Sequence, residues 1–308
     1  MFRTIFVVFL ALIPYFLIGQ NFDWWAQRHN WDGVTHWTKY INVAANSLGP
    51  NALPVPDIKN GQLDSIPYFE FGIVHHRSKG DITSNLNTTL HLPLFDKRIA
   101  LRVWLVPIES YKLDQETQIK RSIRTQDGEG IAGGDIYIAS YFQLLLEQRH
   151  GIDLLMTINL RTASGTQLKD ARFSDTPGYF LDLSAGKSFI LAKTKLRYWR
   201  IYSMSGLYVY QTYLDNNRQN DAFLYGLGTT VAFNKISFHQ QIGGYIGYLN
   251  NGDRPLVLRS EISTNLKAPL NYRLTFQQGF IDFPYTSFWL SAQFNLNKIL
   301  HLSDDQQK

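Results

Sequence analysis

Residues 287–296 read SFWLSAQFNL and alternate between two kinds of side chain. One set is Phe288, Leu290, Ala292, Phe294 and Leu296, and the other is Ser287, Trp289, Ser291, Gln293 and Asn295. Successive side chains of a β-strand point to opposite faces. The segment is therefore predicted to be a strand with one apolar face and one mostly polar face.

The same period of two recurs along most of the chain before this segment. About twelve segments show it, and each is as long as the roughly 9–11 residues that a strand needs to cross a bilayer. They are residues 66–77, 83–94, 98–110, 134–147, 152–163, 178–190, 195–211, 220–233, 235–249, 255–266, 270–281 and 285–297. A soluble barrel or sandwich is the alternative, but its strands usually have about 5–6 residues. The pattern predicts an all-β chain with a transmembrane antiparallel up-and-down β-barrel over residues 65–297, although Gln240 interrupts the apolar face.

The connections between these segments alternate in length. The longer or more variable ones are residues 78–82, 111–133, 164–177, 212–219, 250–254 and 282–284; the shorter ones are 95–97, 148–151, 191–194, Asn234 and 267–269. Transmembrane barrels have short periplasmic turns, longer external loops and an even number of strands. An even number predicts that both ends of the chain lie on the periplasmic side.

The first 19 residues have the pattern of a cleaved secretory signal peptide. Arg3 supplies the positive charge, an apolar run interrupted by Pro14 follows, and the small residue Gly19 stands at the cleavage site. An N-terminal helical anchor is the alternative, but the run is shorter than the roughly 20 residues of a spanning helix.

Composition excludes several classes of protein. The chain has no cysteine, so it forms neither disulfides nor thiolate metal sites. Its net charge of +5 is modest and spread along the sequence, which argues against a nucleic-acid partner. The mean hydropathy of −0.19 is too low for a bundle of membrane-spanning helices.

Residues 20–64 differ from the rest of the chain. They contain four of the seven tryptophans, and Val34, Trp37, Ile41 and Ala44 recur at helical spacing. This spacing predicts a short amphipathic helix that ends at Gly49 and Pro50, followed by an extended connector that contains Pro54 and Pro56. Three roles remain open for this periplasmic segment: a plug in the barrel, a docking element for a periplasmic protein partner, or an anchor with its indole rings at the membrane surface.

The predicted inward face carries the candidate site residues. They are Glu70, Arg102, Asp135, Tyr141, Arg161, Asp182, Arg200, Arg259, Glu261 and Arg273. Rings of charged side chains set the selectivity of pores, so the five arginines and four carboxylates could line a weakly anion-preferring lumen. Alternatively these charges pair with one another and fill a narrow barrel. The inward tyrosines could likewise stack a solute or simply fill space.

Two further features each allow more than one interpretation. Gly226, Gly228, Gly243 and Gly247 are predicted to face inward, where they open the lumen, relieve curvature of the barrel, or let neighbouring side chains pack closely. The 111–133 loop carries Lys120, Arg121 and Arg124, which could contact lipopolysaccharide phosphates, fold over the pore, or remain solvated.

No sequence pattern predicts an enzyme. The spacing of His75, His76 and His91 singles out no catalytic triad, and a His-Glu-x-x-His motif is absent. The strand number is similar to that of the outer-membrane phospholipase family, but that family's His-x-Ser-Asn-Gly stretch is missing. We expect no catalytic residues, no metal and no cofactor.

Over almost its whole length the chain resembles outer-membrane β-barrel proteins of Gram-negative bacteria. The signal peptide, the alternating strands and the aromatic last strand carry this resemblance, whereas the polar periplasmic tail 298–308 departs from it because such barrels often end on an aromatic residue. The resemblance implies an outer-membrane location among lipid and lipopolysaccharide. The expected function is a pore or small-solute transporter; a non-conducting structural or complex-forming barrel and a lipid hydrolase are the alternatives.

Overall fold

The computed structural model describes residues 22–95, 98–190, 196–264 and 268–299. The chain divides into two compact units, Met1–Trp37 and Thr38–Lys308, and each is described by itself. The expected signal peptide, residues 1–19, lies outside the described residues, as do residues 300–308 of the expected tail.

The helix expected around residues 34–48 is wrong. The described part of the first unit contains helix α2 (Asp23–Arg28), and the helical spacing after it yields only the 3-10 helix η2 (Trp37–Tyr40). Beyond η2, the side chain of Asn42 donates to Ser47 Oγ (2.8 Å) and to the carbonyl of Asn251 (2.7 Å). Such side-chain hydrogen bonds compete with helix formation, and here they fix an irregular path.

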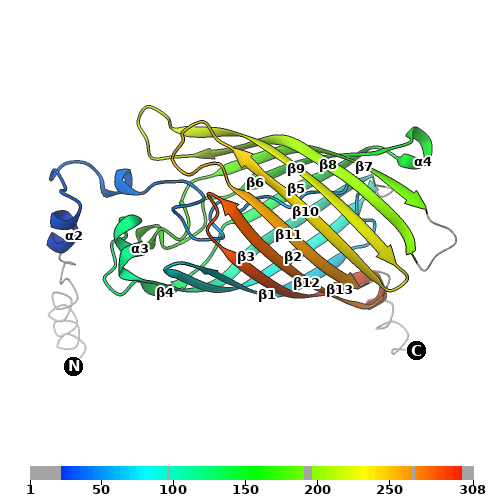
Figure 1. Ribbon diagram of the computed structural model, residues 1–308, viewed down its shortest axis with the longest axis horizontal. Coiled ribbons are helices and arrows are strands. Elements are labelled where there is room, and N and C mark those ends of the chain that lie inside the picture. The colour runs from blue at the N-terminus through cyan, green and yellow to red at the C-terminus, as the bar shows by residue number, and fades with distance from the viewer. Residues whose placement is uncertain (1–21, 96–97, 191–195, 265–267, 300–308) are drawn as a thin grey trace, which may run out of the picture. The chain divides into compact units, whose positions relative to one another are not determined.

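The second unit is a closed antiparallel β-barrel (Figure 1). Its strands are β1 (Tyr68–Ser78), β2 (Asp81–Leu94), β3 (Ile99–Leu113), β4 (Glu129–Ala132), β5 (Ile136–Leu145), β6 (Asp153–Arg161), β7 (Gly178–Ile190), β8 (Leu196–Gln211), β9 (Gln219–Phe233), β10 (Ile236–Ile246), β11 (Leu256–Thr264), β12 (Leu270–Ile281) and β13 (Thr286–Asn295). Strand β1 pairs with both β2 and β13, so the sheet closes on itself. The short strand β4 pairs only with β3, and the other twelve form the barrel wall.

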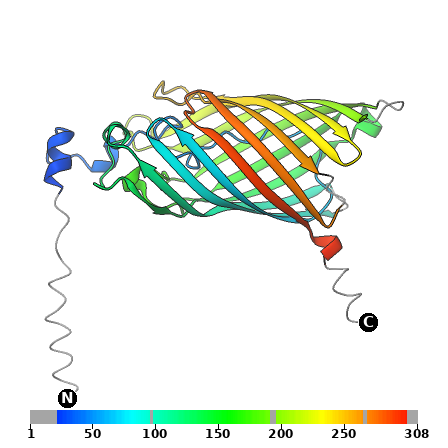
Figure 2. The same ribbon diagram turned by 60° about the horizontal axis from the view of Figure 1, so that its bottom comes forward.

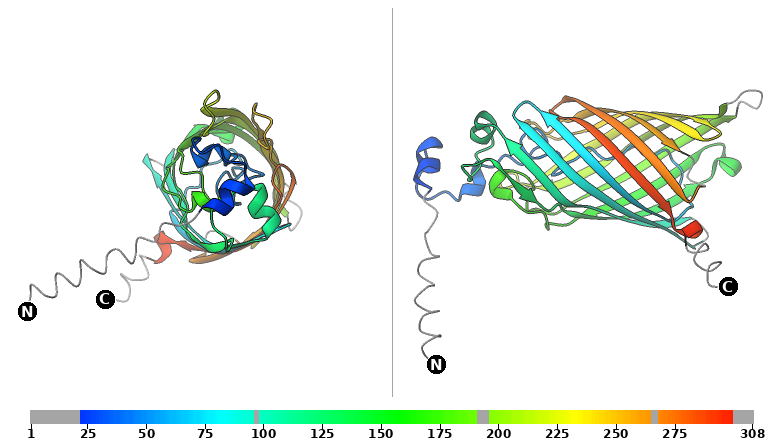
Figure 3. Two further views of the ribbon diagram at one scale, coloured as in Figure 1. Left: turned by 90° about the vertical axis from the view of Figure 1, so that its left-hand side faces the viewer. Right: turned by 90° about the horizontal axis from the view of Figure 1, so that it is seen from below.

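These strands confirm the predicted all-β barrel of about twelve strands. They are tilted relative to the barrel axis, and a view along that axis shows a closed ring (Figures 2 and 3). Closure pairs every wall strand on both sides, which leaves no unpaired sheet edge in lipid. Among the described residues, no helix is long and apolar enough to span a membrane.

The predicted alternation of side chains is present in the wall. On β13, Phe288 and Leu290 point outward and are 53% and 59% exposed, whereas Ser287 of the same strand points inward and is 1% exposed. Gln240 does point outward, as its place in the pattern indicates. Its amide oxygen accepts a hydrogen bond from Ser260 Oγ (2.8 Å), its register partner on β11, so one of its polar atoms is satisfied on the apolar surface.

The two ends of the barrel differ. We call one the long-loop end, with the connections 79–80, 114–135, 162–177, 212–218, 247–255 and 282–285; the other is the short-turn end, with 95–98, 146–152, 191–195, 234–235 and 265–269. The longest loop carries β4 and helix α3 (Gln115–Lys120), while 162–177 carries η4 (Leu168–Asp170) and 146–152 carries α4 (Glu147–His150). The first connection is shorter than expected: it is a two-residue turn in which Gly80 has φ +81°.

Residues 42–64 run through the inside of the barrel, and we call them the threaded segment. At the long-loop end, Asn42 bonds to Asn251. At the short-turn end, Gln62 Nε2 donates to Asp153 (2.8 Å) and the carbonyl of Asp64 accepts from His91 Nε2 (2.9 Å). Most apolar side chains between these ends are buried: Val43, Ala44, Ala45, Leu48, Ala52, Leu53, Val55 and Ile58.

Residues 42–64 belong to the segment expected on the periplasmic side as a plug, a docking element or an anchor, and the structure places them inside the barrel. An even number of strands fixes only where the wall begins and ends. Because the chain crosses the lumen before β1 starts, it enters the barrel at the long-loop end, where Lys39 forms an ion pair with Asp215.

We predict that Leu290→Arg strongly destabilises the barrel, because Leu290 lies outward near the middle of β13. An arginine at mid-depth in lipid should cost about 2–4 kcal/mol of unfolding free energy, measured by guanidinium titration in lipid vesicles. The matched control is Ile281→Arg at the end of β12, which should cost about 0–1 kcal/mol. Equal losses at both positions would contradict the assignment of this surface to lipid.

Candidate functional site

The ten predicted site residues all lie on the inner side of the barrel. Asp135, Tyr141, Arg161, Asp182, Arg200 and Arg259 are buried, and Glu70, Arg102, Glu261 and Arg273 are half-buried. Their contacts divide most of them into residues that hold the threaded segment and residues that pair with one another, whereas Arg102 and Tyr141 line a cavity. Asp135 stands apart at the long-loop end, where it accepts from the amide of Gly165 (2.7 Å).

Three inward arginines hold the backbone of the threaded segment. Arg161 Nη1 donates to the carbonyl of Ala52 (2.6 Å), Arg259 Nη1 to that of Pro56 (3.0 Å), and Arg200 Nε to that of Asn60 (2.9 Å). A buried guanidinium needs acceptors for its donors. The extended, proline-containing segment has carbonyls that no helix or sheet uses, and it supplies those acceptors.

A buried ion pair adds to this hold. Lys59 Nζ of the threaded segment lies 2.7 Å from Asp182 on β7. Asp182 therefore does not pair with another wall residue, as one of the predictions had it, because its partner Lys59 belongs to the threaded segment. Arg200 in turn forms ion pairs with Asp153 (2.9 Å) and Glu147 (3.1 Å) at the short-turn end.

Two glycines make room for an apolar side chain of the threaded segment. A Cβ on Gly226 or Gly243 would stand 2.2 or 2.5 Å from Cδ1 of Ile58. A third, Gly228, gives space to the ring of Tyr202 in the same way. The structure thus favours close packing over an open lumen at these glycines, and Ile58 is a site residue that sequence reasoning missed.

A second group of inward charges pairs within the wall. Arg273 lies 2.6 Å from Glu261 and 3.1 Å from Glu70, and Glu70 also accepts from Ser291 Oγ (2.8 Å). These contacts support mutual pairing as the role of Glu70, Glu261 and Arg273. Arg259, on the same strand face as Glu261, instead donates to Gln277 (2.6 Å) and to the threaded segment.

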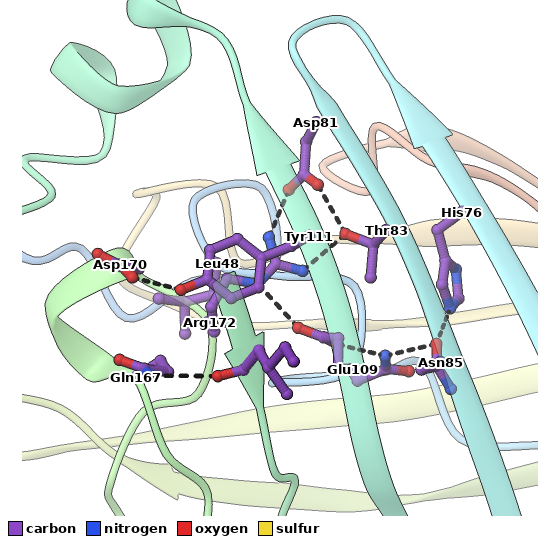
Figure 4. A network of polar contacts seen from close by, with 12 residues as sticks. Leu48, His76, Asp81, Thr83, Asn85, Glu109, Tyr111, Gln167, Asp170 and Arg172 are labelled. Carbon is purple, nitrogen blue, oxygen red and sulfur yellow. Dashed lines mark hydrogen bonds and ion pairs between the residues drawn. The ribbon is translucent and has the colours of Figure 1, made fainter. Parts of the chain in front are cut away.

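A buried cluster of charges at the long-loop end was not predicted (Figure 4). Arg172 lies 2.8 Å from both Asp81 and Glu109, and Arg121 lies 2.7 Å from Asp81; each of these side chains is at most 5% exposed. Burial alone would lower the pKa of Arg172, but Glu109 and Asp81 raise it above its ordinary value. We call these four residues the mouth cluster.

The mouth cluster joins two loops, the wall and the threaded segment. Arg121 comes from the 114–135 loop and Arg172 from the 162–177 loop, while Asp81 and Glu109 belong to strands. Gly49 of the threaded segment lies against Arg172, because a Cβ there would stand 2.7 Å from Nη2. Of the three orientations considered for Arg121, the structure shows the one that points into the barrel. The Arg121 guanidinium is buried there and is not available to lipopolysaccharide.

A serine, a histidine and an asparagine form a hydrogen-bonded chain across three neighbouring strands. His76 Nδ1 lies 2.7 Å from Ser287 Oγ, and His76 Nε2 lies 3.0 Å from Asn85 Oδ1. These groups occur in hydrolases, but here the serine is 1% exposed and faces the inside of the barrel. A lipid on the outer surface does not reach it, so the arrangement stabilises the wall and does not favour a lipid hydrolase.

The lumen is not completely filled. A cavity of about 420 Å³ opens beside the threaded segment toward the short-turn end, and its lining includes Tyr68, His91, Arg102, Tyr141 and Arg273. A second cavity of about 150 Å³ lies farther toward the long-loop end, and Arg102 also lines it.

No protein-family model matches the chain, and a search of curated proteins finds no relative. Solved structures do match. The chain is similar to the COG4313 outer membrane channel from Pseudomonas putida F1, with a TM-score of 0.52 and 12% identity over 78% of this chain and 98% of that chain. It is also similar to the KdgM porin, with a TM-score of 0.46 and 8% identity over 73% of this chain and 98% of that chain. The outer membrane protein Omp33 of Acinetobacter baumannii matches with a TM-score of 0.34 and 11% identity over 76% of this chain and 100% of that chain.

At these identities the likeness concerns the fold. The chain has the fold of bacterial outer-membrane barrels, which confirms the resemblance inferred from its strands.

We predict that Arg172→Met destabilises the protein by about 3–5 kcal/mol, because it leaves Glu109 buried without its cation. The loss should appear as a lower midpoint in guanidinium unfolding, together with faster tryptic cleavage in the 114–135 loop. The same substitution at the exposed Arg218 is the control and should change neither quantity. Unchanged unfolding of Arg172→Met would show that the mouth cluster does not stabilise this end.

We predict that Gly243→Val displaces the threaded segment, because its side chain would occupy the space of Ile58. Limited trypsin digestion should then cut after Lys59, which is protected in the parent protein by its pair with Asp182. Gly133→Val is a suitable control, since the nearest atom to a Cβ there is a carbonyl at 3.8 Å. Protection of Lys59 in both variants would contradict the fit of Ile58 between the glycines.

Proposed function

We propose that the protein is an outer-membrane channel for small solutes, and that the threaded segment closes it at rest. One observation carries the proposal: a separate segment, residues 42–64, runs through the polar lumen that the barrel wall surrounds, and it occupies that lumen together with buried wall side chains such as Tyr137 and Tyr208. Cavities of about 420 and 150 Å³ remain beside that segment.

The contacts of the threaded segment are of kinds that can form and break. No covalent cross-link holds it, because the chain lacks cysteine. Each hydrogen bond to a charged group contributes about 1.5–3 kcal/mol, and water replaces part of it when the bond breaks. The segment also leaves the lumen without disturbing the hydrogen bonds between wall strands.

Removal of the threaded segment would leave charged side chains of the wall without their partners. Arg161, Arg200 and Arg259 would lose carbonyl acceptors, and Asp182 would lose Lys59. The predicted pore-lining set has five arginines and four carboxylates. We therefore propose a weak preference for anions in the open state, with lipid and lipopolysaccharide around the barrel and a cleaved signal peptide for export.

The second candidate is a non-conducting barrel that serves as a structural or complex-forming protein. The buried mouth cluster favours it, because it ties the two longest loops to the wall and contacts the threaded segment. In that case the residues beside the short turns, 59–64, would be the part of the segment accessible to a periplasmic protein partner.

Planar-bilayer conductance separates the two candidates. The refolded mature protein is compared with a variant that lacks residues 42–60 and with the double variant Ile58→Cys/Gly226→Cys. Cγ1 of Ile58 lies 2.7 Å from the position of a Gly226 Cβ, so the two cysteines are within reach of a disulfide. No native cysteine competes with this pair.

We expect steady, weakly anion-selective channels from the deletion variant. The mature protein should open rarely, and the oxidised double variant should stay silent until a reductant is added. Silence from the deletion variant, with its folded barrel verified by a heat-dependent shift on gels, would reject the channel and favour the non-conducting barrel. Equal opening of the oxidised and reduced double variant would show that the segment is not the gate.

A further inference from the structure

We propose that Arg102 is the centre of a binding site for a small monocarboxylate, located in the larger cavity of the lumen. This inference deepens the proposed function by naming a class of solute. It concerns binding only, so it is tested without any measurement of transport.

Arg102 differs from the other inward arginines. Arg161, Arg200, Arg259 and Arg273 each donate to carbonyl or carboxylate oxygens. Arg102 makes no hydrogen bond or ion pair with any described residue, and its Nε is buried without a partner. An unpaired buried donor on a charged group is costly, so the position favours an acceptor that enters from the cavity.

Two acids near Arg102 are engaged elsewhere: Glu70 binds Arg273, and Asp57 lies 3.4 Å from Arg259. A third, Asp64 of the threaded segment, lines the same cavity. The wall therefore supplies no carboxylate to Arg102, although carboxylates lie around the cavity. A monoanion would balance the single free guanidinium, whereas a dianion such as phosphate would add surplus negative charge among these acids.

The surroundings of Arg102 form a wall suited to a carboxylate with a small apolar body. In the register of the sheet, His91 and Ala139 flank Arg102 on β2 and β5. The ring of Tyr68 stacks on that of His91 (5.0 Å between centroids), and Tyr141 meets His91 edge-on (6.0 Å). These rings offer apolar contact next to the charge.

A second residue of the cavity wall also carries a buried donor without a partner. Nε1 of Trp289 is buried without a hydrogen bond, and Trp289 lines both cavities together with Arg102. The planar guanidinium binds a carboxylate through two parallel hydrogen bonds. A volume of about 420 Å³ lies within the range of cavities that bind small molecules.

The test is calorimetric titration of the refolded mature protein in detergent with propionate. Propionamide is the uncharged probe of the same shape, and inorganic phosphate is the dianion. The variants are Arg102→Gln, which removes the charge, Arg102→Lys, which keeps it without the planar fork, and Arg218→Gln in an exposed loop as the control. A heat-dependent gel shift verifies that each variant folds.

We expect propionate to bind and propionamide not to bind. Arg102→Gln should weaken propionate binding by about tenfold or more, and the affinity of Arg102→Lys should lie between those of Arg102→Gln and the parent protein. Arg218→Gln should bind propionate as the parent protein does. Absence of propionate binding, or equal binding by Arg102→Gln, would overturn the site, and tighter binding of phosphate would overturn the choice of a monocarboxylate. If propionate binds but the deletion variant conducts no current, the site stands in a closed barrel and only the channel is rejected.

Discussion

The hydrogen bonds from inward guanidinium groups to backbone carbonyls of the threaded segment are the interaction on which the rest of the structure depends. A barrel with an apolar outside has its polar side chains inside, and buried arginines need acceptors. In this lumen, Arg161, Arg200 and Arg259 find them on the threaded segment, which contains three prolines. The position of the segment then determines where Lys59 meets Asp182 and where cavities remain.

The use of backbone acceptors also separates the charges of the lumen into groups. Arg161 and Arg259 hold the segment without an ion pair to a carboxylate of the wall, whereas Arg200 also pairs with Asp153 and Glu147. Glu70 and Glu261 both pair with Arg273. Arg102 belongs to neither group. A lumen with nearly balanced charge can therefore hold one unpaired cation, because the pairing follows geometry and not the number of charges.

The wall could be predicted from the sequence, because the alternation around Phe288 and Leu290 reports directly which face meets lipid. The inward direction of the ten site residues follows from the same period. Their partners could not be predicted. Arg161 donates to the carbonyl of Ala52, which lies 109 positions away in the chain, and any residue type supplies such an acceptor. The helix expected at Val34–Ala44 failed because Asn42 forms long-range hydrogen bonds that a local period does not report. The mouth cluster was missed because Arg172 and Arg121 lie in loops, where no period assigns a direction.

The barrel wall forms a ring that is closed around residues 42–64 of its own chain. The ring is closed by the pairing of β1 with β13, and β1 follows the threaded segment in the chain. In the finished barrel, the threaded segment and the seam between β1 and β13 are therefore neighbours along the polypeptide. If the seam closes last, it captures the segment as it forms, and the order of assembly decides whether the lumen is occupied; a barrel that closed first would have to be threaded end-on.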